Sequence, residues 1–343
     1  MALTFKEPHS IRATYRIVTP MFIGDAEQKA SGISPASVKG ALRFWWRALM
    51  WGKILTDEKM DSNAALQALH QQESALFGSS ADKGNAATFT LRVDAASVKT
   101  EHKTDFPKGG NDPSGYLGLG LWESGSHAKG NFQPHREYIS ENQTFSVTLK
   151  IQPSVSTAQQ QTLKDALLAW GLFGGLGSRA RRAFGSVAIQ SIDNTFFTFS
   201  KTTDYFAAVN QLFATYRLES ITQPPFTAFG KGSRFAINDK SEKDARTAHA
   251  TLGMKFKDYR GQPSPLRGSV KRVFGMPYAG GTRLEGEARR ASPLLFHVHP
   301  IGNQFVGALL FMPAHFHHDT ALDRPSYTLA RDFLDQLQGS LVA

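Results

Sequence analysis

The chain has 343 residues, enough for two domains, and its hydrophobic content of 41%, with 25 Phe and 5 Trp, excludes global disorder. A formal net charge of +10 favours a polyanionic partner, because each neutralised phosphate releases counterions, although a basic protein without such a partner would carry the same charge. The absence of cysteine excludes disulfides, zinc–thiolate sites and Cys nucleophiles, and the lack of an apolar leader or of any span-length apolar run predicts a soluble, cytoplasmic protein with no membrane partner.

The first part of the chain alternates strand and helix patterns. Alternating hydrophobic and polar residues predict strands at 11–18, 87–94, 143–151 and 184–192. Apolar residues spaced three and four apart predict helices at 35–52, 63–76 and 157–172. Strand, helix, helix, strand, strand, helix, strand is the split βαβ order of a ferredoxin-like domain with one added helix. The segment 95–140 has no steady period and is predicted to be a long insertion.

The second half is less regular, and a domain boundary is predicted near 193–200. Helices are predicted at 202–217, 241–257, 264–275 and 320–338. Strands are predicted at 293–299 and 303–311, joined by a tight turn at Gly302 and Asn303. A faint echo of Ser34-Pro35 in Ser264-Pro265 is consistent with a degenerate second copy of the first fold.

The sharpest motif is FGGLGSRARRAFGSV, residues 173–187, directly after a predicted helix. Its glycines let backbone amides approach an anion without obstruction by Cβ, and its arginines present guanidinium forks that suit phosphate oxygens. A dinucleotide fingerprint is excluded because the run follows a helix, and a Walker loop is excluded because Gly-Lys-Ser/Thr is missing. The plainer interpretation is a helix C-cap and a tight turn with solvated arginines. The candidate phosphate ligands of this motif are Gly175, Gly177, Ser178, Arg179, Arg181 and Arg182.

The second motif is SPASVKGALRFWWRAL, residues 34–49. Lys39, Arg43 and Arg47 follow i, i+4, i+8 spacing and therefore share one face of the predicted helix. Trp46 falls beside this basic stripe. A basic stripe with an adjacent aromatic suits single-stranded nucleic acid, since arginines hold phosphates and rings stack on bases. The alternative is an amphipathic helix with a solvated basic edge and a buried Trp pair.

Further candidates carry weaker signals. Arg289 and Arg290 precede a predicted strand of the second half. His297 and His299 alternate on that strand, but no carboxylate stands at a metal-ligand spacing from them. The cluster at 315–318 fits no metal motif either. With no nucleophile elbow, paired carboxylates or P-loop, the sequence predicts no catalytic residue, no metal and no cofactor.

Five segments together resemble the RAMP superfamily of CRISPR proteins. They are VTPMFIGD (18–25), SPASVKGALRFWWRAL (34–49), LFGSS (76–80), GGLGSRARRAFGSV (174–187) and RRASPL (289–294). Within the superfamily, the nearest pattern is that of the first-subunit family of the Cmr module, the type III-B effector.

The resemblance implies an α+β fold of two tandem ferredoxin-like (RRM-like) domains, 1–195 with its insertion and 196–343, the second divergent. It implies a non-catalytic subunit at one end of a ribonucleoprotein for antiviral defence, near the 3′ region of the guide RNA (crRNA). Expected partners are guide RNA, target RNA and other Cmr-module subunits, chiefly RAMP backbone subunits. By position, the RNA-binding residues carried over are Lys39, Arg43, Trp46, Arg47, the Gly-rich loop residues above, Arg289 and Arg290.

Two other functions stay open from sequence. One is a metal-independent guide-RNA-processing endoribonuclease, also found in the superfamily, with His135 or another histidine as acid/base and the Gly-rich loop as phosphate clamp. The other is an assembly protein that touches no RNA. The binding hypothesis requires the basic helix and the Gly-rich loop to converge on one groove.

Overall fold

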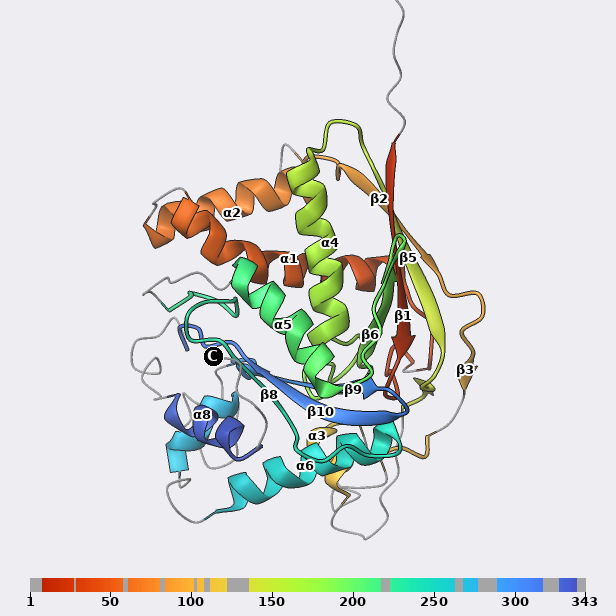
Figure 1. Ribbon diagram of the computed structural model, residues 1–343, viewed down its shortest axis with the longest axis vertical. Coiled ribbons are helices and arrows are strands. Elements are labelled where there is room, and N and C mark those ends of the chain that lie inside the picture. Colours follow the sequence, from red (N-terminus) through yellow and green to blue (C-terminus); the bar gives the residue numbers. More distant parts are fainter. Residues whose placement is uncertain are drawn as a thin grey trace, which may run out of the picture.

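The protein, described here from a computed structural model, combines two larger antiparallel sheets with helices packed around them (Figure 1). Helices and strands are mixed along the chain, as the α+β prediction requires. None of the helices within the described ranges has the length and apolar content needed to cross a membrane. The structure describes residues 8–27, 29–57, 61–80, 84–101, 104–107, 112–121, 136–216, 223–262, 268–276, 289–316 and 327–337.

The first sheet has the strand order β2-β5-β1-β6-β7, with every neighbouring pair antiparallel. Its strands are β1 (His9–Ile17), β2 (Phe89–Asp94), β5 (Thr144–Ile151), β6 (Val187–Ile192) and β7 (Thr195–Phe196). The four predicted strands are confirmed. The last begins at Val187 rather than 184, because Ser186 instead pairs with Gly175 across the preceding loop.

Helices α1 (Pro35–Asp57) and α4 (Thr157–Phe173) cover one face of this sheet, and α2 (Ser62–Phe77) packs on α1 (Figure 1). Asp61 caps α2, and Ser156 and Gln159 form a capping box on α4, which satisfies N–H groups left free at a helix start. α1 continues past the predicted end at residue 52, because its last turns are buried through Trp51 and Ile54.

The second sheet has the order β8-β10-β9 and lies between helices (Figure 1). The elements of this half are α5 (Thr202–Tyr216), β8 (Arg234–Ile237), α6 (Ala245–Gly261), the 3₁₀ helix η2 (Gly268–Phe274), β9 (Leu294–Ile301), β10 (Gln304–Phe311) and α8 (Thr328–Asp335). On one face Tyr205 of α5 contacts Phe235, with ring centroids 5.3 Å apart. On the other, Phe256 of α6 contacts Phe296 at 5.0 Å.

Several details of the second half differ from prediction. Strand β8 was not predicted, since four residues carry too little periodicity to separate a strand from a loop. The helix predicted from 241 begins at Ala245, because the Asp244 side chain accepts from the Thr247 amide and caps it. The described part of the predicted helix 264–275 is the 3₁₀ helix η2, and the described part of 320–338 holds α8.

The described part of the insertion at 95–140 packs on the second half through α3. It contains β3 (Thr100–Glu101), α3 (Pro113–Leu117) and β4 (Tyr138–Ile139). α3 lies so close to α6 that a Cβ on Gly253 would fall 2.2 Å from the Pro113 carbonyl oxygen. His135 lies outside the described residues.

The hydrophobic core runs across the predicted boundary near 195. Phe173, at the end of α4, contacts Phe213, Phe229 and Phe235 of the second half at centroid distances of 6.2, 6.0 and 5.5 Å. The same buried cluster includes residues of β1, α1, α5 and β10. The loop after α4 is therefore held between the two halves.

Candidate nucleic-acid interface

The basic stripe of α1 is organised by one carboxylate. Arg43 Nε lies 2.6 Å from Glu73 Oε1, and Arg47 Nε lies 3.2 Å from Glu73 Oε2. Arg43 also donates to the Gly78 carbonyl at 2.6 Å. The Arg43 and Arg47 side chains remain 34% and 45% exposed while Glu73 is only 10% exposed. Two oriented guanidiniums that share one carboxylate leave a net positive surface.

The prediction that Trp46 stacks on a base is wrong. Its side chain is 3% exposed, its ring packs against Phe77 at 5.8 Å, and its Nε1 donates to Thr162 Oγ1 at 3.0 Å. α1 is covered on two sides, by α2 and α4, so its apolar face is wide enough to include the position beside the stripe. The partly exposed aromatic near the stripe is Phe44 instead.

The Gly-rich loop uses its backbone amides internally. Leu176 donates to the Gly185 carbonyl at 2.9 Å, Ser178 to the Phe22 carbonyl at 2.8 Å, and Arg182 to the Arg179 carbonyl at 2.7 Å. These three amides are therefore not free to bind an anion, contrary to the prediction that the backbone amides of this loop approach one.

The loop glycines allow close backbone packing. Gly177 has φ +90°, and a Cβ there would lie 2.5 Å from the Phe22 carbonyl oxygen. A Cβ on Gly175 would lie 2.8 Å from the Gly185 carbonyl oxygen. RNA contact by Gly175, Gly177 and Ser178 stays a prediction.

Arg182 is not a phosphate ligand at the surface, contrary to prediction. Its guanidinium lies over the Phe256 and Phe296 rings, 5.1 and 5.0 Å from their centroids, and donates to the Phe274 carbonyl at 3.2 Å. Burial, followed by the nearby Arg260, lowers its pKa to about 9, so the group stays charged at neutral pH. A bridge between Arg182 and Phe296 of β9 draws this residue into the second half.

The other two loop arginines lie nearer the surface. Arg179 is exposed, and burial of part of its side chain together with Arg136 lowers its pKa. Arg181 donates to the Ser292 carbonyl at 2.9 Å, and burial followed by the charge of Arg290 lowers its pKa to about 10. Neighbouring arginines thus help to lower both pKa values. Arginines this close repel one another, and a bound anion would relieve that repulsion.

Unpaired guanidinium nitrogens surround the loop. Buried nitrogens without a hydrogen-bond partner belong to Arg136, Arg182, Arg260 and Arg290. Within the described ranges, the ion pairs include no carboxylate bound to any of these four. The Arg182, Arg260 and Arg290 guanidiniums lie over aromatic rings instead, and these contacts stabilise their charge inside the protein.

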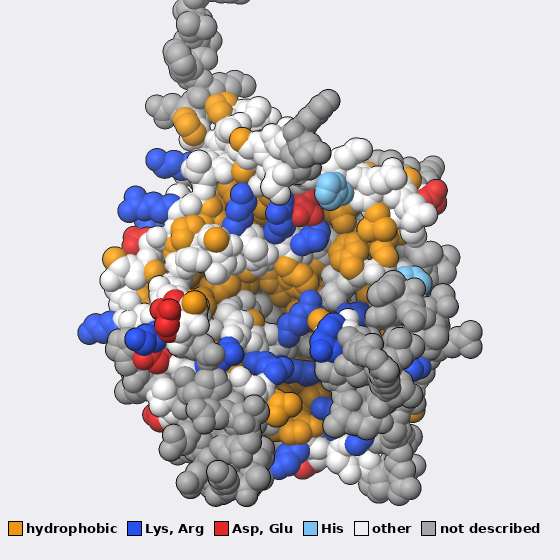
Figure 2. All heavy atoms as spheres, turned by 180° about the vertical axis from the view of Figure 1, so that it is seen from behind, with side chains coloured by type: hydrophobic (Ala, Val, Ile, Leu, Met, Phe, Trp, Pro, Cys, Tyr) orange, Lys and Arg blue, Asp and Glu red, His pale blue; other side chains and the backbone are white. Residues whose placement is uncertain are grey.

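The loop and the basic helix converge. The Arg181 guanidinium lies 5.1 Å from the centroid of Phe44 on α1, and a Cβ on Gly174 would lie 2.7 Å from Trp45 Nε1. Figure 2 shows Lys and Arg side chains gathered on a hollowed face, above and below a band of hydrophobic side chains. Arg290 lies near Arg181, and Arg289 is exposed beside it. The requirement of a shared groove is therefore met.

Sequence reasoning missed Arg136 and Arg260 as members of this cluster. Arg136 donates to Ser178 Oγ at 2.9 Å from the far end of the insertion, and Arg260 comes from the last turn of α6. Neither belongs to a motif with the loop. The only signal available was the general excess of positive charge.

The three buried histidines have structural roles. His297 Nδ1 lies 3.0 Å from the Gly174 carbonyl oxygen, its Nε2 lies 3.1 Å from His299 Nδ1, and His299 stacks on Tyr205 at 3.9 Å. Burial lowers the pKa of His297 to about 3 and that of His299 well below its ordinary value. His249, also buried, bridges Ser114 and the Arg182 carbonyl. Among the described residues no group of three His or acidic side chains could hold a metal ion.

The buried His249 predicts an acid-sensitive fold. Burial lowers its pKa from 6.5 to about 4, so its stabilising effect is complete above pH 6.5 and is lost as the pH falls toward 4. At pH 5, about 1.5 units below the unfolded value, the loss is about 2 kcal/mol. Urea unfolding at pH 7.5 and 5.0 measures this loss.

His249→Gln should reduce the difference in the free energy of unfolding between the two pH values, while His70→Gln, at an exposed site, should not. An equal pH dependence in all three proteins would contradict this assignment.

Comparison with known proteins adds a family and a fold. Residues 14–188 match the family model described as the RAMP superfamily. A curated relative, the CRISPR system Cmr subunit Cmr1-2 of Pyrococcus furiosus, is 26% identical over 187 residues, which cover 51% of this chain and 92% of that protein.

Two solved structures share the fold over almost the whole chain. The crystal structure of Cmr1 from Pyrococcus furiosus in its apo form has a TM-score of 0.60 at 20% identity and covers 97% of this chain and 98% of that one. A chain of the cryo-EM structure of the type III-B Cmr-beta bound to cognate target RNA has a TM-score of 0.58 at 11% identity and covers 97% and 99%. Both likenesses extend through the second half, beyond the segment that the family model matches.

Proposed function

The chain belongs to the RAMP superfamily, and from this premise we propose that it is a non-catalytic, RNA-binding subunit of a type III-B CRISPR ribonucleoprotein. It holds guide RNA in its 3′ region, together with target RNA, at one end of the particle and contacts RAMP backbone subunits of the Cmr module. The observation that carries the proposal is the convergence of the partly exposed Arg43 and Arg47 of α1 with Arg179 and Arg181 of the Gly-rich loop. The relatives add support, since one is named as a Cmr subunit and another is part of a complex bound to target RNA.

The geometry suits a single-stranded sugar-phosphate chain. The loop side of the groove carries Arg179 and Arg181, and the helix side carries Arg43 and Arg47 on Glu73. Phe44 lies between them, where the Arg181 guanidinium covers its ring. Contacts of this kind hold phosphates and fix register without reading bases, so we expect little base specificity.

We further propose that the fold is a tandem of ferredoxin-like units, with the second divergent. In the first unit the chain runs β1, helices, β2, β5 and α4, and β5 lies between β1 and β2 in the sheet. In the second unit the chain runs β8, α6, β9, β10 and α8, and β10 lies between β8 and β9 with the same antiparallel pairing. The second unit thus repeats three of the four strand positions of the first.

The three buried histidines do not favour the endoribonuclease alternative. A general acid or base needs a titratable group that reaches the ligand. His297, His299 and His249 are buried and bonded to the chain itself, and burial holds their pKa values low. We therefore propose that this subunit holds RNA and does not cut it.

The proposal is tested by titrating labelled single-stranded RNA with the purified chain across a salt series. We expect binding whose log K falls with log salt at a slope of roughly −2 to −4, since each of three to five neutralised phosphates contributes about −0.7. The RNA, including repeat sequence, should be recovered uncut. A flat salt dependence would remove the electrostatic basis of the proposal, and specific cuts abolished by one His→Ala substitution would establish the nuclease instead.

A further inference from the structure

The face of the first sheet that points away from the helices carries its own cationic surface. Strand register places side chains of β1, β5 and β2 in lateral rows on this face. The middle row holds Arg12, Thr148 and Arg92, and the row beside it holds Ser10, Lys150 and Thr90. Arg12, Arg92 and Lys150 are all exposed. The other face of the same strands is buried against α1 and α4.

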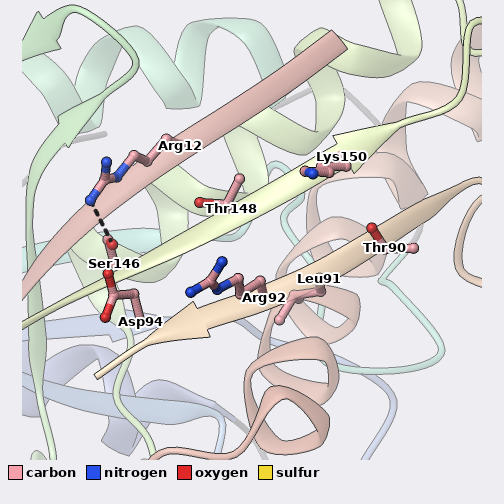
Figure 3. A pocket seen from close by; sticks show the side chains of 8 residues that line it. All are labelled: Arg12, Thr90, Leu91, Arg92, Asp94, Ser146, Thr148 and Lys150. Carbon is pink, nitrogen blue, oxygen red and sulfur yellow. Dashed lines mark hydrogen bonds between the residues drawn. The ribbon is translucent and has the colours of Figure 1, made fainter. Parts of the chain in front are cut away.

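These rows line a groove of about 420 Å³, shown in Figure 3. Its lining includes three cations, one carboxylate, Asp94, and the hydroxyls of Thr90, Ser146 and Thr148. Arg12 Nη2 donates to Ser146 Oγ at 3.2 Å, which holds one guanidinium against the sheet. In the part of the chain that the structure describes, none of the three cations forms an ion pair.

The chemistry of this lining selects one kind of ligand. Ferredoxin-like domains of the RRM type bind bases by stacking them on sheet aromatics, and no aromatic side chain lines this groove. Guanidinium and ammonium groups instead suit phosphates, and the interleaved hydroxyls can exchange hydrogen bonds with 2′-hydroxyls. A groove with three cations to one carboxylate is complementary to a sugar-phosphate backbone.

We propose that this groove is a second RNA-binding surface, which contacts a sugar-phosphate backbone without reading or stacking bases. The inference rests on the proposed function and extends it. The strands separate this groove from the helix layer that contains α1 (Figure 1), so the chain can bind two RNA segments on different faces at once.

The test compares two variants of the full chain with equal losses of charge. The groove variant is Arg12→Gln/Arg92→Gln/Lys150→Gln, and the control is Lys201→Gln/Lys240→Gln/Lys243→Gln, at exposed lysines of the second half. Binding of a labelled single-stranded RNA of about 40 nucleotides is titrated over a salt series. We expect the groove variant to lower the salt slope by about 2, because about 0.7 is lost with each of three phosphate contacts, and the control to leave it nearly unchanged.

Photo-crosslinking with 4-thiouridine RNA supplies a readout that total charge does not move. Wild-type protein should give crosslinked peptides from β2 and β5 as well as from α1 and the Gly-rich loop. The groove variant should lose only the crosslinks to β2 and β5. Urea unfolding confirms that the variant is folded. If RNA binds with crosslinks at α1 and the loop alone, and the slope of the groove variant matches the control, the second surface is refuted while the proposed function stands. If wild-type protein binds no RNA, the proposed function itself fails.

Discussion

Replacement of three arginines around the Gly-rich loop, Arg179→Gln/Arg181→Gln/Arg290→Gln, should lower the affinity for single-stranded RNA about 100-fold or more at 0.15 M salt. Charge-assisted hydrogen bonds to phosphate contribute about 1.5–3 kcal/mol each, and even partial loss of three gives an effect of this size. The slope of log K against log salt should become shallower by about 2. Fluorescence anisotropy over a salt series measures both quantities.

Stability should move the other way in this variant. Burial, and after it the charges of Arg290 and Arg136, lowers the pKa values of Arg181 and Arg179, so the variant removes partly buried, mutually repelling charges at the cost of the Arg181 bond to the Ser292 carbonyl. We expect the urea midpoint to be unchanged or raised. The control Lys201→Gln/Lys240→Gln/Lys243→Gln should keep its RNA affinity within a few fold. A triple variant that loses stability and keeps its RNA affinity would show that these arginines serve the fold and not a ligand.

The second large effect is expected from Gly177→Ala, which should lower the stability of the fold, whereas the arginine variant should lower RNA affinity. A Cβ at this position would lie 2.5 Å from the Phe22 carbonyl oxygen, in a backbone with φ +90°. Overpacking and an unfavourable left-handed residue together should reduce the free energy of unfolding by about 2–4 kcal/mol. Urea unfolding followed by circular dichroism measures the change.

Gly40 provides the matched control. It lies within α1, and a Cβ there would meet no atom within 4 Å. Gly40→Ala should therefore raise the free energy of unfolding by about 0.5–1 kcal/mol, because alanine favours the helix. If Gly177→Ala instead folds with full stability and binds RNA poorly, the glycine serves close approach of the ligand and not internal packing.

The elements with strong periodicity could be predicted from sequence, and the contacts between distant segments could not. The four long strands of the first half, with α1, α2 and α4, lie close to their predicted positions, since hydrophobic period and capping residues act locally. β8 was missed because its four residues are identified only by pairing with β10. Local signals carry no information on such pairing.

The candidate site shows the same division. The stripe of Arg43 and Arg47 follows from helical geometry, but their shared partner Glu73 comes from another helix. Trp46 and Arg182 were predicted to face RNA, and both are drawn inward by elements far along the chain, α4 for the first and β9 for the second. A side chain's neighbours on its own element do not show which packed layers will cover it.

The anchoring of the Gly-rich loop to the second half has a consequence for how the subunit is made. The Gly174 carbonyl contacts a residue 123 positions later, and the Phe296 amide donates to the Arg181 carbonyl. Contacts between positions this far apart form only after most of the chain has left the ribosome. The surface shared by α1 and the Gly-rich loop is therefore completed only after β9 has been synthesised, whereas the groove on the outer face of the first sheet needs no residue beyond Lys150.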